Sequence, residues 1–355
     1  MTLSEFHHSQ AKVFIDIGGY QIPAYYQNAI AEFRVAQKAA MMDRSFIGKL
    51  RVFGKDRELL LHRLTANEMR NLKTGEGVVN IFTNAKGRVV DVVEMLVEAN
   101  SFFLLTSSGR AQIVKEWIEK YTFIEDVKSE DVTSQYGIIS LFGEASAELL
   151  QQLFAWQANN LPAQHARLLV HDEKSIIVQR SGTITPVQFN LIVPVSEMEK
   201  FWQRLMTKAT PIGYAAYEMW RIHRGLPAVD KEITDEYNPH EVGLFPFINF
   251  EKGCYIGQEV IARLDSYQKV QRQLTGVNLE IHEFDVQFFS ATPAPIYVGD
   301  QLIGQLTSAC FSPERGHAIG LAVIRKQFAR QADPVQVRWP ERKVAGRMEN
   351  LPFSI

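Results

Sequence analysis

The order of predicted strands and helices repeats along the first 206 residues, and this repeat restricts the possible folds more than any other feature. The first unit has predicted helices at residues 57–64 and 111–121 and strands at residues 49–53, 78–83, 88–97 and 102–106. The second has helices at residues 145–155 and 196–206 and strands at residues 136–142, 167–170, 175–179 and 188–193. Two tandem β-α-β-β-β-α units predict a duplicated α+β framework with antiparallel sheets.

The regions outside this repeat have their own patterns. A helix is expected over residues 22–43, before the first unit, and another over residues 214–223. From about residue 269, short strands separated by Gly and Pro predict a small β-barrel, with strands at residues 274–279, 296–297, 301–308, 318–324 and 335–339. The expected domains are residues 1–268, containing both α+β subdomains, and residues 269–355, the barrel.

Charge and composition exclude several classes of protein. The formal net charge of −2 argues against binding nucleic acid, because proteins that grip many phosphates carry a basic excess. No apolar stretch approaches the roughly 20 residues that span a bilayer, and residues 1–8 lack the apolar core of a signal peptide, so we expect a cytoplasmic protein without membrane contact. Cys254 and Cys310 are the only thiols, too few for a disulfide framework, a zinc site or a resident iron–sulfur cluster.

Residues 252–259, here called the signature segment, combine two glycines, a cysteine and four polar groups in front of a predicted helix. Apolar residues at a spacing of four place the start of this helix near Gly257. Its first turn would offer unpaired backbone N–H groups beside the Cys254 thiol, which suits an anion or the edge of a heteroaromatic ring. The alternative is a glycine turn that caps an ordinary helix.

Asp91 stands in an otherwise apolar strand, between two valines on each side. By alternation Val89, Asp91 and Val93 share one face of the strand, while Val90 and Val92 share the other, so neither face is purely polar. A carboxylate in such a place is either held for a ligand or takes part in a structural salt bridge.

The signature segment resembles that of the YgfZ-type folate-binding proteins, which are relatives of the T-protein (aminomethyltransferase) of the glycine cleavage system. Other motifs resemble T-protein landmarks in family order along most of the chain, at residues 42–50, 64–68, 84–91, 220–227 and 304–313. This resemblance implies a compact T-protein-like body that binds tetrahydrofolate, or a one-carbon derivative, in a central cleft. The cofactor-binding residues that it implies are Asp91, Arg221, Lys252, Tyr255, Gln258 and Glu259.

Two departures from the T-protein pattern bear on the activity. In T-proteins the aspartate in the region of Asp91 is thought to steer N5 of tetrahydrofolate, and a second aspartate usually stands where this chain has Val92. The glutamate that grips the pteridine is replaced by Pro186, which cannot accept those hydrogen bonds. We therefore expect little or no glycine-cleavage activity, although Asp91 stays a candidate catalytic residue.

Cys254 and Arg221 each have two interpretations. Near a helix N-terminus and Lys252 the pKa of the Cys254 thiol should fall, which favours a catalytic nucleophile, a redox sensor or a transient cluster contact that alkylates faster than Cys310. The alternative is a buried structural cysteine. Arg221 is expected to pair with the glutamate tail or a ring carbonyl of folate, or else with Glu218 or Glu232.

The resemblance leads to one main functional hypothesis and two alternatives. The main one is a tetrahydrofolate-binding protein that acts in folate-dependent maintenance of iron–sulfur enzymes and, indirectly, in tRNA modification, with an iron–sulfur assembly factor or client enzyme as its partner. The first alternative is an aminomethyltransferase of the glycine cleavage system, which requires a lipoylated carrier protein. The second is a non-catalytic folate-sensing scaffold. Whether the protein turns over as a folate-dependent one-carbon transferase is left open.

Overall fold

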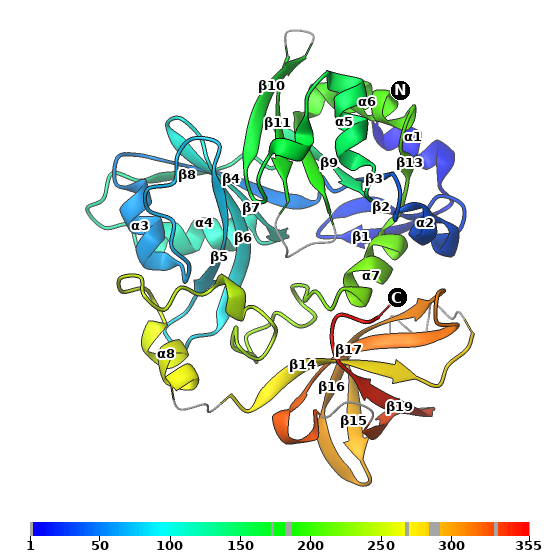
Figure 1. The fold of residues 1–355 in the computed structure, drawn as a ribbon. Helices are drawn as coiled ribbons and strands as arrows, with labels where there is room; N and C mark the ends of the chain where they lie inside the picture. The colour runs from blue at the N-terminus through cyan, green and yellow to red at the C-terminus, as the bar shows by residue number, and fades with distance from the viewer. Residues whose placement is uncertain are drawn as a thin grey trace. The chain divides into compact units, whose positions relative to one another are not determined.

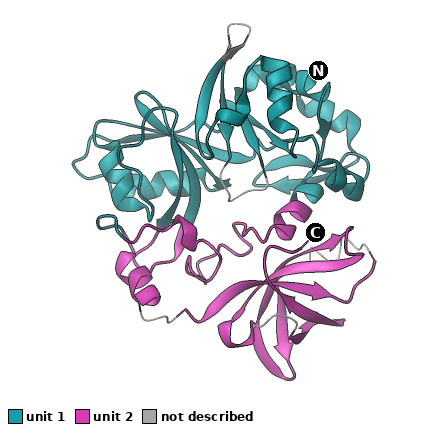
Figure 2. Ribbon diagram, viewed as in Figure 1, with its two compact units in different colours: residues 1–82, 91–217, 251–255 teal, residues 83–90, 218–250, 256–355 magenta. Residues whose placement is uncertain are grey.

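The computed structural model describes residues 3–171, 174–181, 187–266, 270–283, 292–329 and 333–354. The chain forms two compact units (Figure 2): unit 1 holds residues 1–82, 91–217 and 251–255, and unit 2 holds residues 83–90, 218–250 and 256–355. The expected domain boundary at residues 268–269 lies outside the described residues. Unit 2 contains chain from both sides of that boundary.

The first repeat forms a five-stranded sheet in unit 1 (Figure 1), with the strand order β5-β6-β7-β4-β8. Its elements are β4 (Ile47–Phe53), α3 (Arg57–Leu64), β5 (Gly77–Thr83), β6 (Val89–Val97), β7 (Ser101–Ser108), α4 (Ala111–Lys120) and β8 (Lys128–Asp131). Helix α4 packs against β4, β7 and β8. It buries Ala111, Val114 and Ile118, whose spacing forms the apolar stripe of an amphipathic helix.

The second repeat forms a six-stranded sheet with the order β10-β11-β12-β9-β3-β13. Its elements are β9 (Tyr136–Phe142), α5 (Ser146–Phe154), β10 (Ala166–His171), β11 (Lys174–Arg180), β12 (Phe189–Pro194) and α6 (Met198–Met206). Leu149, Leu150, Phe201 and Trp202 of the two helices lie in one buried cluster with strand residues such as Leu191. In both sheets a three-stranded meander lies next to the first strand of its repeat, so the predicted duplication is confirmed.

The helix expected over residues 22–43 is wrong. That region contains β2 (Tyr20–Tyr25), α2 (Ala29–Val35) and β3 (Ala40–Asp43), and it is preceded by α1 (Leu3–Gln10) and β1 (Val13–Ile17). Strand β2 pairs with β1. Strand β3 pairs with β9 and with the short β13 (Thr210–Pro211). Pro23 cannot donate a backbone hydrogen bond inside a helix. The Asn28 side chain accepts hydrogen bonds from the backbone of Ile30 and Ala31, both at 3.0 Å, and so starts α2 late.

Unit 2 contains the predicted barrel, which is closed and has the strand order β14-β17-β16-β15-β18-β19. The strands are β14 (Arg272–Leu279), β15 (Ala294–Val298), β16 (Gln301–Ser312), β17 (His317–Arg325), β18 (Pro334–Arg338) and β19 (Lys343–Glu349). The sequence prediction missed β19, in which Val344, Gly346 and Met348 are buried and alternate with exposed residues. The prediction of an α+β body with a terminal barrel is confirmed.

The described residues also form two longer helices and four short 3-10 helices. Helix α7 (Tyr214–His223) agrees with its prediction, and α8 (Gln258–Ser266) begins directly after Gly257. The 3-10 helices are η1 (Ala158–Asn160), η2 (Val195–Glu197), η3 (Phe245–Phe247) and η4 (Lys326–Phe328).

A buried ion pair fastens the chain around α7 to barrel strand β16, within unit 2. Arg221 donates from Nη1 to Glu232 Oε2 at 3.1 Å, and from Nε and Nη2 to the Glu218 carboxylate, each at 2.8 Å. On the barrel side, Ser308 Oγ accepts from Arg221 Nη2 at 2.7 Å, and the hydroxyls of Thr307 and Ser308 both donate to Glu232 Oε1 at 2.6 Å. The Glu232 side chain is completely buried and that of Arg221 is 2% exposed, so each charge depends on the other.

Removing one member of this pair should destabilise unit 2 strongly. Arg221→Met would leave the Glu232 carboxylate buried without its counter-charge, which lowers the free energy of unfolding by about 3–5 kcal/mol. Urea denaturation measures the loss. Arg338→Met is the control, because its partner Asp300 is fully exposed and the pair adds little stability. A second change, Glu232→Gln, should restore part of the loss, and equal effects of Arg221→Met and Arg338→Met would contradict this role.

Candidate functional site

Asp91 is a buried carboxylate that is only half satisfied. It lies on β6, is completely buried, and accepts one hydrogen bond at Oδ2 from the backbone N–H of Ser107 on β7, at 3.0 Å. Its Oδ1 has no hydrogen-bond partner in the described part of the chain. Burial raises the pKa of Asp91 to about 6, although hydrogen bonding with Ser107 and the charge of Arg110 oppose the rise. Such an oxygen is open to an N–H or O–H donor from a ligand.

Arg44 is a second unsatisfied group in unit 1, and the sequence analysis did not assign it a role. The residue is 5% exposed and follows β3. Its Nη2 lies 3.5 Å from the Tyr217 hydroxyl, and its guanidinium carbon lies 5.0 Å from the centre of the Tyr217 ring. Nε and Nη1 have no acceptor among the described residues. The sequence signal that could have indicated a role for Arg44 is its position directly after an apolar strand.

Lys252 anchors the signature segment to the end of α3. Its Nζ donates to the backbone oxygens of His62 at 2.8 Å, Thr65 at 2.6 Å and Asn67 at 2.8 Å. Burial lowers the pKa of Lys252 to about 7, while the charge of Glu68 acts in the opposite direction. Three acceptors need three N–H donors, which only the ammonium form has, so we assign the charged state. A cation at this position also complements the helix dipole of α3.

Tyr255 and Cys254 differ sharply in exposure. Tyr255 is 7% exposed, its ring centre lies 5.3 Å from Lys252 Nζ, and burial raises its pKa to about 12. Cys254 is exposed, which contradicts the alternative interpretation of a buried structural cysteine, whereas Cys310 is buried. Because α8 begins only at Gln258, Cys254 lies outside the first turn of that helix.

The second half of the signature segment belongs to unit 2 and turns tightly against the hairpin between β5 and β6. Thr83 Oγ1 donates to the backbone oxygen of Ile256 at 2.5 Å. Gly257 has a φ of +85°, and a Cβ there would lie 2.5 Å from the backbone oxygen of Asn84, so only glycine fits. This turn leads into Gln258, which is half-buried, and Glu259, which is exposed.

The structure thus separates the predicted site residues into two groups. Asp91, Lys252, Cys254 and Tyr255 belong to unit 1, whereas Arg221, Gln258 and Glu259 belong to unit 2. The hydrogen bonds of Arg221 and Lys252 go to protein groups, including both Glu218 and Glu232, so the geometry gives no support to a ligand role for these two cations. Pro186 lies outside the described residues.

Two family descriptions together match nearly all of the chain. The GCVT N-terminal domain matches residues 3–252, and the glycine cleavage T-protein C-terminal barrel domain matches residues 272–354. The chain belongs to the glycine cleavage T-protein family. The barrel match coincides with β14 to β19, and the N-terminal match includes Asp91, Arg44 and Lys252.

Relatives of this T-protein family member carry two kinds of name. It is 29% identical over 315 residues to a putative chloroplastic transferase of Arabidopsis thaliana, which covers 88% of this chain and 71% of the relative. It is 27% identical over 361 residues to an aminomethyltransferase of Chlorobium limicola, covering 99% of this chain and 98% of the relative.

A solved structure supports the fold. The crystal structure of the glycine cleavage system aminomethyltransferase T from Bartonella henselae covers 100% of this chain and 97% of its own, with a TM-score of 0.88 at 20% identity. The T-protein fold is therefore shown. Within the described ranges, no helix is both long and apolar enough to cross a membrane.

Replacing Asp91 by asparagine should stabilise the protein in a pH-dependent way. The carboxyl has a pKa of about 6 when folded and about 3.9 when unfolded, so its contribution to stability is complete below about pH 4 and is lost as the pH rises through 6. Asparagine cannot ionise. The free energy of unfolding of Asp91→Asn should therefore exceed that of the native protein by about 3 kcal/mol above pH 7. Urea denaturation at pH 5 and pH 8 measures the difference.

Asp43→Asn is the control with the opposite sign. Burial would raise the pKa of Asp43, but hydrogen bonds to His7 and Ser45 lower it below its ordinary value. Its ionised form therefore stabilises the protein throughout this pH range, and Asp43→Asn should destabilise at both pH values. A pH-independent effect of Asp91→Asn would show that the Asp91 carboxyl has an ordinary pKa.

Proposed function

We propose that the protein binds tetrahydrofolate, or a one-carbon derivative, at a site in unit 1 that includes Asp91. We further propose that it acts in folate-dependent maintenance of iron–sulfur enzymes, as a YgfZ-type member of the family. The partner would be an iron–sulfur assembly factor or a client enzyme, and the effect on tRNA modification would be indirect.

The observation that carries this proposal is the free Oδ1 of Asp91. A completely buried carboxylate oxygen without a donor is costly, and a ligand that supplies an N–H removes that cost. A reduced pterin ring has N–H groups of this kind. With a pKa of about 6, the Asp91 carboxyl is mostly ionised at neutral pH and still able to take up a proton, as a general base requires.

Arg44 offers the complementary chemistry in the same unit. Its Nε and Nη1 hydrogens need acceptors, and the Tyr217 ring holds one side of the guanidinium. Pterin carbonyl and ring nitrogen atoms, or a ligand carboxylate, are acceptors of the required kind. An unsatisfied acceptor and an unsatisfied set of donors are the two kinds of group that a pterin can engage. Bound folate would supply the capacity to carry a one-carbon unit.

The signature segment has a divided role in this proposal. Lys252 holds the segment in place through its three carbonyl contacts, and Tyr255 provides an aromatic wall. Cys254 is the exposed group available for a nucleophilic or redox step or a cluster contact. Gln258 and Glu259 belong to unit 2; they stay predictions from the family resemblance and are not part of this unit 1 site. Arg221 is assigned to the structure of unit 2.

An aminomethyltransferase of the glycine cleavage system is the second candidate. It is favoured by relatives with that name that align over nearly the whole chain, such as the one from Chlorobium limicola. Two sequence departures oppose it: Val92 stands where T-proteins have a second aspartate, and Pro186 replaces the pteridine-binding glutamate. The lipoylated carrier protein would be a substrate only for this candidate.

Tetrahydrofolate binding should depend on Asp91. Isothermal titration under anaerobic conditions should show binding to the native protein, and a concentration of 100 times the Kd should add about 2.7 kcal/mol of stability. Asp91→Asn should weaken the affinity about tenfold or more, because a charge-assisted hydrogen bond is lost. Asp131→Asn, which changes an exposed aspartate on β8, should bind like the native protein.

The same protein is then given lipoylated carrier protein loaded with the aminomethyl group. The proposal expects little or no release of ammonia, whereas carrier-dependent turnover would establish the aminomethyltransferase instead. Absence of folate binding, or equal affinity in the Asp91→Asn and Asp131→Asn variants, would overturn the proposed site.

Cys254 tests the iron–sulfur part of the proposal. Because Cys254 is exposed and Cys310 is buried, iodoacetamide should label Cys254 in the native protein and Cys310 only after unfolding. Cys254→Ala should keep the melting temperature and the folate affinity, yet fail to rescue cells with an iron–sulfur or tRNA-thiolation defect. Cys310→Ala should lower the melting temperature and still rescue. Full rescue by Cys254→Ala would remove the thiol from the function.

A further inference from the structure

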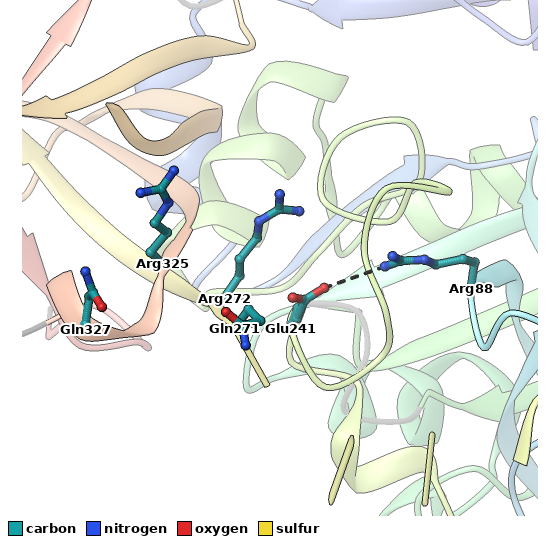
Figure 3. Close-up of a pocket in the computed structure, with 6 residues that line it drawn as sticks. All are labelled: Arg88, Glu241, Gln271, Arg272, Arg325 and Gln327. Carbon is teal, nitrogen blue, oxygen red and sulfur yellow. Dashed lines mark ion pairs between the residues drawn. The ribbon is translucent and has the colours of Figure 1, made fainter. Parts of the chain in front are cut away.

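A basic pocket of about 360 Å³ lies within unit 2, away from the residues assigned above. The described residues that line it are Arg88, Glu241, Gln271, Arg272, Arg325 and Gln327. They come from the hairpin between β5 and β6, the loop before the signature segment, the start of β14 with the residue before it, the end of β17 and η4 (Figure 3). Pockets of this size accommodate small metabolites.

Two of the arginines lie side by side on neighbouring strands, and the described residues provide no counter-charge for them. Arg272 of β14 and Arg325 of β17 are direct partners in the antiparallel ladder, so their Cα atoms are about 5 Å apart and their side chains leave the same face. Like charges directly opposite each other on neighbouring strands are destabilising. No carboxylate in the described part of the chain forms an ion pair with either of them.

Other arginines of the barrel are paired, which makes this arrangement specific. Arg315 contacts Glu349 at 2.8 Å, and Arg338 contacts Asp300 at 3.5 Å. Arg272 and Arg325 therefore differ from these two arginines in having no carboxylate partner among the described residues.

The third arginine is held by its own carboxylate. Arg88 Nη1 lies 3.8 Å from Glu241 Oε2 and donates to the backbone oxygen of Glu236 at 2.8 Å (Figure 3). Glu241 is buried and also accepts from the backbone N–H of Asn238 at 3.1 Å. The lining contains three arginines and one glutamate, so it keeps an excess of two positive charges.

Arg272 is also oriented by an aromatic ring. Its guanidinium carbon lies 5.5 Å from the centre of the Tyr237 ring, and this stacking limits the directions in which its N–H groups point. Gln271 and Gln327 add neutral amide donors and acceptors beside the two charges. The lining therefore combines two cationic side chains that can bind a dianion with amide groups that can form hydrogen bonds to hydroxyls.

We propose that this pocket binds the phosphate group of a small phosphate monoester, with Arg272 and Arg325 as its two cationic contacts. Two guanidinium groups from paired positions on adjacent strands supply the two cations that a dianion on one tetrahedral centre requires. A phosphate also removes the repulsion between the two arginines. The glutamine amides contact the hydroxyl-bearing part of the molecule. This site is independent of the folate site proposed for unit 1.

Isothermal titration with ribose 5-phosphate tests the proposal on the full chain. The native protein should bind ribose 5-phosphate, and Arg272→Gln and Arg325→Gln should each weaken binding about tenfold or more. Lys343→Gln is the matched control, because it removes one exposed positive charge far from the pocket. Lys343 lies on β19 past the residue that pairs with Leu279, the last residue of β14, whereas Arg272 is the first residue of β14. It should leave the affinity unchanged.

A second readout separates binding from damage to the fold. Since each arginine variant relieves a cross-strand repulsion, the ligand-free variants should melt at or above the native temperature, yet lose the upward shift that ribose 5-phosphate gives the native protein. Ribose should cause no shift, and citrate should compete weakly. Equal weakening by Lys343→Gln, undiminished binding to the Arg272→Gln/Arg325→Gln protein, or tighter binding of citrate than of ribose 5-phosphate would overturn the proposal.

Discussion

Taking a charge out of water is costly unless neighbouring groups bind it, and this constraint separates structural from functional residues here. Arg221, Glu232 and Lys252 are buried and surrounded by partners within their own unit, so they hold the fold together. Asp91 and Arg44 are buried as deeply, but each keeps polar atoms without a partner in the described residues. Because a folded chain rarely leaves such atoms unused, these two residues are the stronger candidates for ligand contact.

The fold could be predicted where local patterns and the repeat agreed. Helices α3 and α7 lie at the residues where the sequence predicted them, and both sheets keep the predicted order of elements. The secondary structure of residues 22–43 could not be predicted from their helix-favouring composition alone. Residues 40–43 form a strand because they pair with β9, which lies far away in the sequence. Strand β19 was missed, although its buried Val344 and Met348 alternate with the exposed Lys343 and Arg347 as in a strand with one buried face.

The site could be predicted only in part, because most of its contacts join residues far apart in the sequence. Alternation around Asp91 correctly indicated that the carboxylate is not simply solvent-facing. No local pattern could show that Lys252 reaches the carbonyls of Thr65 and Asn67, or that Arg221 meets Ser308. A motif identifies which residues a family uses, whereas the partners of a buried cation follow from tertiary structure.

The magnitudes at Asp91 connect stability to ligand binding. Keeping a carboxylate of raised pKa ionised at neutral pH costs the folded protein about 3 kcal/mol. A ligand present at 100 times its Kd returns about 2.7 kcal/mol, which is nearly the same amount. The free protein therefore holds Asp91 in a charge state that lowers its stability, and a bound donor would offset that cost. Since replacement by asparagine would relieve this cost, the carboxylate is better explained by what it binds than by what it stabilises.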